Sequence, residues 1–189
     1  MHSFNYGKQI EHLFQSVAQK NGWDVVHASK QDDMYRHIDY VMKKDNRTLT
    51  VDVKSQKREA RFMEIQDEWH AIEFVGVVYP ATKTVHFSRT PFNVCIPNFS
   101  LGSGRPGWLY GDADMIAFEL QSRFILVDRL SLMNHCAESV KFKPLVHRSQ
   151  DAKYHAYSRH GRGDLIAYIN KKDLYHLAEE KWYKPIVLN

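Results

Sequence analysis

Apolar residues recur at two different spacings along this chain of 189 residues, and each spacing predicts one kind of element. In residues 7–21 they recur every three or four positions, which is typical of a helix with one buried face. In residues 37–57 apolar and polar residues alternate on both sides of Asp45-Asn46, which predicts two strands joined by a tight turn. Further strands are predicted over residues 23–27, 69–79, 84–88, 113–120, 124–128 and 164–170. A polar loop is predicted over 29–33, a short helix from the end of the strand at 128 to about 135, and a second helix over 172–182. This mixture predicts an α/β fold with a mixed central sheet, flanking helices and extra β elements after residue 60.

The predicted hairpin places two carboxylates opposite each other. A two-residue turn fixes the register and gives the strands one apolar face, formed by the pairs Ile38–Val53, Tyr40–Val51 and Met42–Leu49. On the other face Asp39 lies opposite Asp52, and Lys54 points to the same side as Asp52 because strand side chains alternate. Like charges directly opposed across a ladder are unfavourable unless they are neutralised, so this geometry suggests a divalent cation. The alternative is a surface ion-pair cluster that contributes less than about 1 kcal/mol.

Composition and charge favour a globular protein with an anionic partner. Hydrophobic residues make up 43% of the chain and aromatic residues 13%, which argues against disorder. A net charge of +4 and a pI of about 9.0 favour nucleic acid as the partner without requiring it. Two isolated cysteines, Cys95 and Cys136, form no disulfide framework and fit a reducing cytoplasm. No apolar run approaches the ~18 residues of a membrane span and the N-terminus lacks the apolar core of a signal peptide, so we expect a cytoplasmic protein without a membrane partner.

One domain over residues 1–189 is the simplest interpretation, with an irregular insertion at about 80–107. Within that insertion, residues 102–107 match the GxGxxG pattern of dinucleotide-binding loops. Pro106 disrupts the loop and no helix is predicted after it, so we interpret the match as a surface excursion. The eleven histidines occur without the spacing of a zinc site, and the chain contains no Walker loop and no nucleophile elbow.

The candidate residues occur in an order that resembles the PD-(D/E)XK nuclease superfamily. Glu11 lies on the first predicted helix, Asp39 begins the hairpin, and Asp52-Val53-Lys54 follows on the next strand. Ile38 stands in place of the proline of the motif, which is often missing in the superfamily. Residues 6–57 are most similar to the archaeal Holliday-junction resolvases, and further matching positions are Gly7, Phe14 and Gly22-Trp23. The resemblance implies a restriction-endonuclease-like core, with the catalytic core at about 6–57 and further strands at about 108–170.

The resemblance also implies a Mg²⁺ site, in which Mn²⁺ is a substitute. Asp39 and Asp52 would be direct ligands, joined by the backbone carbonyl of Val53, and Glu11 would bind a metal-bound water or a second ion. Lys54 would orient the attacking water or stabilise the charge on the phosphate, and Gln56 could support the nucleophile from the same face. For Glu11, a solvated helix position is the alternative, because it lies at the edge of the apolar stripe.

The activity that the resemblance implies is hydrolysis of DNA phosphodiester bonds to a 5′-phosphate and a 3′-hydroxyl, on junction or flap structures. We expect Lys57, Arg58, Arg159 and Arg162 to contact the DNA backbone, with solvated turns as the alternative. A catalytically silent nucleic-acid-binding protein of the same fold and an RNase are the competing functions. A homodimer and a bacterial or phage-infected cytoplasm as the setting also belong to this hypothesis.

Three further groups leave two interpretations open. His37 lies opposite Lys54 in the predicted register, either as a phosphate contact or as a filling residue. Asp112 and Asp114 are either a second carboxylate pair or caps of a strand, and the second role fits their place at a strand start better. Several aromatic residues near basic ones could stack on bases, although most should belong to the core: Trp108, Tyr110, Tyr154 and Tyr157.

Overall fold

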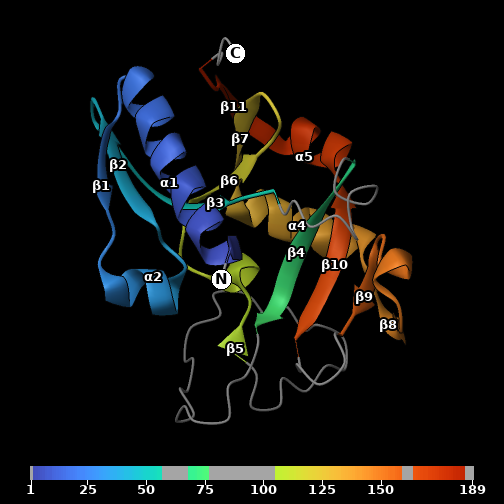
Figure 1. Cartoon of the computed structure of the whole chain (residues 1–189). Coiled ribbons are helices and arrows are strands. Elements are labelled where there is room, and N and C mark those ends of the chain that lie inside the picture. The colour runs from blue at the N-terminus through green and yellow to red at the C-terminus, as the bar shows by residue number, and fades with distance from the viewer. Residues whose placement is uncertain (1, 57–67, 77–104, 159–163, 186–189) are drawn as a thin grey trace.

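The computed structural model describes residues 2–56, 68–76, 105–158 and 164–185, and within them it contains two mixed β-sheets and four α-helices (Figure 1). The helices are α1 (His2–Lys20), α2 (Lys30–Arg36), α4 (Arg129–Ser139) and α5 (Lys171–Leu177), with 3-10 turns η2 (Trp108–Tyr110) and η3 (Ser149–Asp151). The strands are β1 (Asp24–His27), β2 (Tyr40–Lys44), β3 (Arg47–Lys54), β4 (Trp69–Gly76), β5 (Arg105–Pro106), β6 (Met115–Glu119), β7 (Arg123–Asp128), β8 (Lys141–Val146), β9 (His155–Tyr157), β10 (Leu165–Asn170) and β11 (Ala178–Tyr183). The α/β class and the mixed sheet are therefore confirmed. No helix in these ranges is long and apolar enough to cross a membrane.

The larger sheet carries the predicted hairpin in its first half. Its strand order is β1-β2-β3-β6-β7-β11, and only β3 and β6 run parallel. The hairpin has the predicted register, with Tyr40 paired to Val51 and Met42 to Leu49. Asp45 adopts a positive φ of 52° in the turn, as a tight hairpin requires of an Asp or Asn.

The two faces of this sheet pack against different partners. On one face lies α1, whose predicted apolar stripe is buried; Phe14 of the helix stacks on Trp182 of β11 with ring centroids 5.6 Å apart. The buried cluster on this side comprises Ile10, Phe14, Val17, Ala18, Trp23, Val25, Tyr40, Met42, Val51, Val53, Met115, Ala117, Phe124, Leu126 and Trp182. The stripe at helical spacing therefore positions α1, and Glu11 with it, over the hairpin.

The other face of the large sheet packs on the second sheet, which has the order β5-β4-β10-β9-β8, and on α4 and α5. Side-chain alternation divides β7 between the two cores: Phe124 and Leu126 face α1, whereas Ile125 and Val127 face the second sheet. In Figure 1, α1, β1, β2 and α2 lie on the left, and the second sheet lies on the right with α4. The large sheet is thus covered on both faces along β6 and β7.

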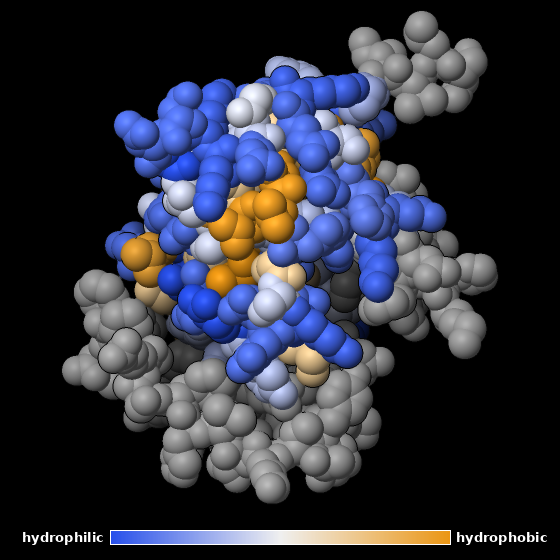
Figure 2. All heavy atoms as spheres, turned by 90° about the vertical axis from the view of Figure 1, so that its left-hand side faces the viewer, coloured by the Kyte–Doolittle hydropathy of each residue, from blue (hydrophilic) through white to orange (hydrophobic). Residues whose placement is uncertain are grey.

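The side of the molecule formed by α1, β1 and α2 is mostly polar, with one gathering of apolar side chains (Figure 2). Three large hydrophobic side chains of these elements are exposed: Val26 of β1 at 58%, and Met34 and Tyr35 of α2 at 49% and 47%. β1 is the outer strand of the large sheet, and its alternation buries Val25 under α1 while it turns Val26 outward. This strand is therefore packed on one face only.

Two of the predicted elements were wrong because capping and tertiary pairing outweigh the local pattern. Residues 29–33 do not form a loop; they begin α2, where the side chain of Ser29 accepts a hydrogen bond from the backbone of Asp32. The helix predicted over 172–182 ends at Leu177, and the chain continues as β11 along the open edge of β7. That pairing buries Trp182 against the α1 core, which a helix ending at the same residue would not do.

Ile38 is a third correction, because it does not share the apolar face of Tyr40. His37 adopts a left-handed conformation with φ of 54° as it ends α2, and β2 begins only at Tyr40. The strand alternation therefore does not extend to Ile38, which packs in the second core. The strand predicted over 84–88 and most of the 80–107 insertion lie outside the described residues.

We expect the substitution Gly107→Ala to lower the free energy of unfolding by about 1–3 kcal/mol, because it overpacks the contact between β5 and β4. A Cβ atom at this position would lie 2.2 Å from the backbone oxygen of Glu73 and 2.8 Å from the carbonyl carbon of Phe74. Urea unfolding followed by circular dichroism measures the change. Gly7→Ala is the matched control: nothing lies within 4 Å of its Cβ, and alanine stabilises a helix by roughly 0.5–1 kcal/mol over glycine. Equal effects of the two substitutions would contradict the close approach at Gly107.

Candidate functional site

The candidate site lies where β2 separates from β3. At this point the backbone N–H of Asp39 donates to the carbonyl of Val51 at 2.9 Å, the last rung between the two chain segments. The next hydrogen bond with β3 is made by the Asp39 side chain, whose Oδ2 accepts from the N–H of Val53 at 2.7 Å. Asp39 is therefore fixed against β3 through Val51 and Val53, one residue before β2 begins, and its carboxyl group interacts with that of Asp52.

Asp52 and Lys54 lie on the same face of β3, as predicted. Asp52 is buried, with 2% of its surface exposed, and its Oδ1 forms a salt bridge of 2.7 Å with Nζ of Lys54. The Lys54 ammonium in turn lies 5.1 Å from the ring centroid of Trp108, an attractive cation–π geometry. The second oxygen of Asp52, Oδ2, is buried and accepts no hydrogen bond from an N–H or O–H group in the described part of the chain, and the carboxyl group of Asp39 lies within hydrogen-bonding reach of Asp52. Two adjacent carboxylates, one of them buried, are unfavourable unless a proton or a cation neutralises them.

Negative charge is concentrated around Asp39. Burial raises the pKa of Asp52 to about 8, Lys54 opposes this effect, and the neighbouring Asp39 adds to it. Burial is also the main cause of the raised pKa of Glu11, followed by repulsion from Asp39 and then from Asp33. The pKa of Asp33 is raised by burial first and by Asp39 second. Four carboxyl groups therefore interact at this end of the hairpin, and each of the three raised pKa values has Asp39 among its causes.

Tyr40 carries a second buried polar atom without a partner. Its hydroxyl makes no hydrogen bond within the ranges that the structure describes, and its ring lies 4.6 Å from that of His27. The pKa of Tyr40 is raised, chiefly by burial and then by the charges of Glu11 and Asp39. Tyr40 belongs to the core under α1 and Asp52 faces the other core, so Asp39 interacts with one such side chain on each face of the sheet.

These residues suit a hydrated divalent cation. Mg²⁺ usually keeps several waters and takes one or two carboxylates from the protein, which matches Asp39 and Asp52. Within the described ranges, no three or more His, Cys, Asp or Glu side chains are arranged to enclose an ion by themselves. The donor set therefore fits Mg²⁺ or Mn²⁺ bound through water, with Glu11 at hand for a bound water, and it does not resemble a closed structural zinc site.

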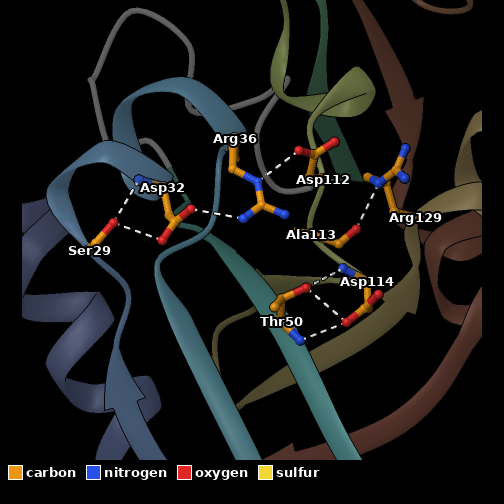
Figure 3. A network of polar contacts seen from close by, with 8 residues as sticks. All are labelled: Ser29, Asp32, Arg36, Thr50, Asp112, Ala113, Asp114 and Arg129. Carbon is orange, nitrogen blue, oxygen red and sulfur yellow. Dashed lines mark hydrogen bonds and ion pairs between the residues drawn. The ribbon is translucent and has the colours of Figure 1, made fainter. Parts of the chain in front are cut away.

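Arg36 ties the helix α2 to the segment that precedes β6 (Figure 3). Arg36 bridges Asp32 of its own helix at 2.9 Å and Asp112 at 2.8 Å, from Nη1 and Nε respectively. A Cβ atom at Gly111 would lie 2.8 Å from the backbone oxygen of Arg36, so the residue must be glycine for this close approach. Asp112 is thus an ion-pair partner for α2.

Asp114 caps the start of β6, as its position suggested. Its Oδ2 accepts hydrogen bonds from both the backbone N–H and the hydroxyl of Thr50, each at 2.8 Å, and Thr50 Oγ1 accepts from the Asp114 N–H at 2.9 Å (Figure 3). Arg129 continues the network by donating to the carbonyl of Ala113 at 2.7 Å. The interpretation of Asp112 and Asp114 as structural residues is therefore favoured over a second carboxylate site.

His37 takes a structural position as well. Burial is the main cause of its lowered pKa, the charge of Lys54 acts in the same direction, and a hydrogen bond with the backbone of Pro106 opposes them. The imidazole is therefore neutral at pH 7 and is directed to β5. Of the two interpretations that the sequence left open, the filling residue agrees with this environment better than a phosphate contact.

A buried glutamate that the sequence did not single out joins four chain segments. Glu119 is fully buried and accepts hydrogen bonds from the Tyr6 hydroxyl at 3.0 and 3.1 Å and from the backbone N–H of Gln56 at 2.9 Å. Its Oε1 also forms a salt bridge of 2.8 Å with Nζ of Lys184. Glu119 thereby holds the start of α1 and the residues after β3 next to the candidate site.

The remaining predicted site residues fall into two groups. Val53 is buried in the α1 core and contributes its N–H to Asp39, while Gln56 lies just beyond β3 with its backbone bonded to Glu119. Their proposed roles as a carbonyl ligand and as a support for the nucleophile stay predictions. The predicted DNA-contacting residues lie outside the described ranges: Lys57, Arg58, Arg159 and Arg162.

Sequence reasoning missed Asp33 and Tyr40 as members of the site. Asp33 follows the helix-capping pair Ser29 and Asp32, which is the signal that could have placed it on a helix facing the hairpin. Tyr40 was predicted only as an apolar-face residue, although its position next to Asp39 brings its hydroxyl near the carboxylates. Comparison of the chain with protein-family models, with curated proteins and with solved structures gives no match.

Proposed function

We propose that this protein is a divalent-metal-dependent DNA endonuclease with a restriction-endonuclease-like core. The observation that carries the proposal is the meeting of Asp39 and Asp52 at the point where β2 leaves β3, with Lys54 bound to Asp52 at 2.7 Å. The mixed sheet with α1 on one face and Glu11 electrostatically coupled to Asp39 supports the same assignment. By the resemblance of residues 6–57, the substrate is a branched DNA such as a junction or a flap.

In this proposal each side chain has a defined task. Asp39 and Asp52 hold Mg²⁺ or Mn²⁺, assisted by the Val53 carbonyl, and Glu11 accepts a hydrogen bond from a bound water. The bound cation would polarise the scissile phosphate and lower the pKa of the attacking water. Lys54 places a positive charge beside the phosphate and stabilises the negative charge that grows on it. Trp108 keeps the Lys54 ammonium in place from one side, at 5.1 Å.

We expect the purified protein to cut DNA in Mg²⁺ or Mn²⁺ and to stop in excess chelator. The experiment offers five labelled DNA substrates of related sequence: linear duplex, nicked duplex, flap, four-way junction and single strand. Lys54→Ala should lose cleavage on every substrate while still binding DNA, because it removes the charge beside the phosphate and the salt bridge to Asp52 but leaves every carboxylate in the chain. Asp151→Asn, in an exposed pair with Arg148 far along the chain, is the matched control and should cut like the wild type.

The competing functions are outcomes of the same experiment. Binding of DNA without cleavage in either metal would support a catalytically silent nucleic-acid-binding protein, and cleavage of matched RNA but not DNA would support an RNase. Calorimetric titration with Mn²⁺ adds a reading that does not depend on activity. We expect the wild type and Asp151→Asn to bind Mn²⁺ and Asp39→Asn to lose this binding. A wild type that does not bind Mn²⁺ would contradict the proposed metal site.

A further inference from the structure

A second group of side chains at the far edge of the large sheet combines positive charge with aromatic rings. The Arg123 guanidinium carbon lies 4.6 Å from the ring centroid of Tyr183 and 5.6 Å from that of Tyr175. Nζ of Lys181 lies 5.0 Å from the Tyr175 ring, and Arg123 Nη1 donates to the Tyr183 hydroxyl at 3.1 Å. We refer to Arg123, Tyr175, Lys181 and Tyr183 as the Tyr183 surface.

This surface is open to solvent and is held in shape. Tyr183 is 66% exposed, although it follows Trp182, which is 4% exposed and belongs to the α1 core. The fold therefore uses Trp182 for packing and does not need the Tyr183 ring for that purpose. The contacts with Arg123 fix the orientation of the ring in advance, which lowers the entropy lost when a planar ligand stacks on it.

The Tyr183 surface lies on the same face and at the same end of the sheet as Lys54. Lys54 is paired with Phe118, Phe118 with Ile125, and Tyr183 with Arg123 two residues before Ile125. Because side chains of opposed strand residues point to the same side, and residues two apart do too, Lys54, Arg123 and Tyr183 face one way. From β3 to β11 there are three strand spacings, about 15 Å in all, a distance that a few unpaired nucleotides can span.

Charge and chemistry define the ligand that such a surface accepts. Arg123 and Lys181 provide cations, while the neighbouring Lys184 is already paired with Glu119. Glu180 is engaged elsewhere, since it accepts from Trp182 Nε1 at 2.9 Å and lies 3.9 Å from Arg47. Two tyrosines beside two cations suit bases that stack and phosphates that pair, and only unpaired nucleotides expose the face of a base.

We propose that the Tyr183 surface binds unpaired nucleotides of the DNA strand whose phosphodiester lies at the Asp39–Asp52 site, a proposal that rests on the function proposed above. One base stacks on Tyr183, and Arg123 and Lys181 contact the adjoining phosphates. The surface thereby favours substrates with a single-stranded arm over continuous duplex.

The test measures binding of a fluorescent single-stranded oligonucleotide and of the matching duplex by anisotropy, in chelator so that no cutting occurs. Tyr183→Ala should weaken single-strand binding by roughly tenfold, with little change for the duplex, and Tyr183→Phe should retain most of the affinity because the ring remains. The matched control is Arg148→Ala, which removes an exposed cation that pairs with Asp151 at 3.7 Å, outside the large sheet. Thermal melting confirms that each variant is folded.

Each outcome decides the proposal separately from the nuclease assignment. Unchanged single-strand affinity in Tyr183→Ala overturns it, as does an equal loss for duplex, and so does an equal loss in Tyr183→Phe. A wild type that binds single strands through Tyr183 but cuts no DNA supports the surface and refutes the nuclease. A wild type that cuts DNA with the same substrate preference as Tyr183→Ala supports the nuclease and refutes the surface.

Discussion

Replacing Asp52 by asparagine is expected to abolish DNA cleavage and, in the absence of metal, to make the protein more stable. Asparagine keeps the shape of the side chain but removes the charge that holds the cation, so cleavage should fall by roughly 10³-fold, the order found when a single group that stabilises transition-state charge is removed. The stability gain follows from burial: Asp52 is 2% exposed, and the neighbouring carboxyl group of Asp39 further disfavours its charged form. An amide in its place carries no charge, so burying it costs less free energy than burying a carboxylate.

The stability gain of Asp52→Asn should depend on pH, because the pKa of Asp52 differs between the folded and the unfolded chain. Burial raises the pKa of Asp52 to about 8 in the folded protein, whereas an unfolded aspartate has a pKa of about 3.9. Its contribution to stability is therefore fully present below pH ~4 and is lost as the pH rises towards 8, where the buried carboxyl must ionise. The substitution Asp52→Asn should thus stabilise most at and above pH ~8, by about 1–3 kcal/mol after the lost attraction to Lys54 is subtracted, and little at pH ~4.

Urea unfolding in chelator at pH 5 and pH 8.5 measures the effect, and Asp151→Asn serves as an exposed control. A variant that is less stable than the wild type at pH 8.5 would contradict the prediction. Such a result would mean that the Asp52–Lys54 pair is a net stabilising contact, as in a structural ion pair, and would weaken the metal site as well.

Replacing Glu119 by alanine is expected to cause the largest loss of stability, about 3–5 kcal/mol. The change removes one partner of a buried pair and leaves the Lys184 ammonium, whose side chain is 11% exposed, without its carboxylate at 2.8 Å. It also removes the acceptor for the Tyr6 hydroxyl and for the Gln56 backbone. A buried polar group that loses its partner costs more than the original bond contributed.

Urea unfolding of two further variants provides the comparison for the stability loss in Glu119→Ala. Glu119→Gln keeps an oxygen acceptor and should lose clearly less than Glu119→Ala. Asp151→Ala breaks an exposed pair, with side chains 79% and 56% exposed and 3.7 Å apart, and should change stability by less than about 1 kcal/mol. A loss in Glu119→Ala as small as that of Asp151→Ala would show that the four-segment junction does not hold the fold together.

The hairpin could be predicted from the sequence because its determinants are local. The turn at Asp45-Asn46 and the alternation on both sides of it fix the register as far as Tyr40 and Val51, and extending it by one residue predicted that Asp39 and Asp52 lie near each other. The same alternation placed Lys54 beside Asp52. The prediction failed one residue before Asp39, at Ile38, because the left-handed His37 breaks the strand pattern there.

What the sequence could not supply depends on contacts between distant segments. Glu119 meets Tyr6, which is 113 residues away, and no local pattern marks an acidic strand residue as the centre of a junction. β11 forms because the edge of β7 is open, although residues 172–182 show the spacing of a helix. Asp33 joins the carboxylates only because Arg36 and Asp112 dock α2 beside the hairpin.

Asp52 and Lys54 lie on β3 inside a six-stranded sheet, and Asp39, which directly precedes β2, is bonded to the backbone of β3 through both its N–H and its carboxylate. Their spacing is therefore set by backbone pairing and not by the segments that connect the strands. Substitutions, insertions and deletions in those connections can accumulate without moving the carboxylates. The chemistry of the centre and the choice of substrate can consequently change independently in the descent of this chain.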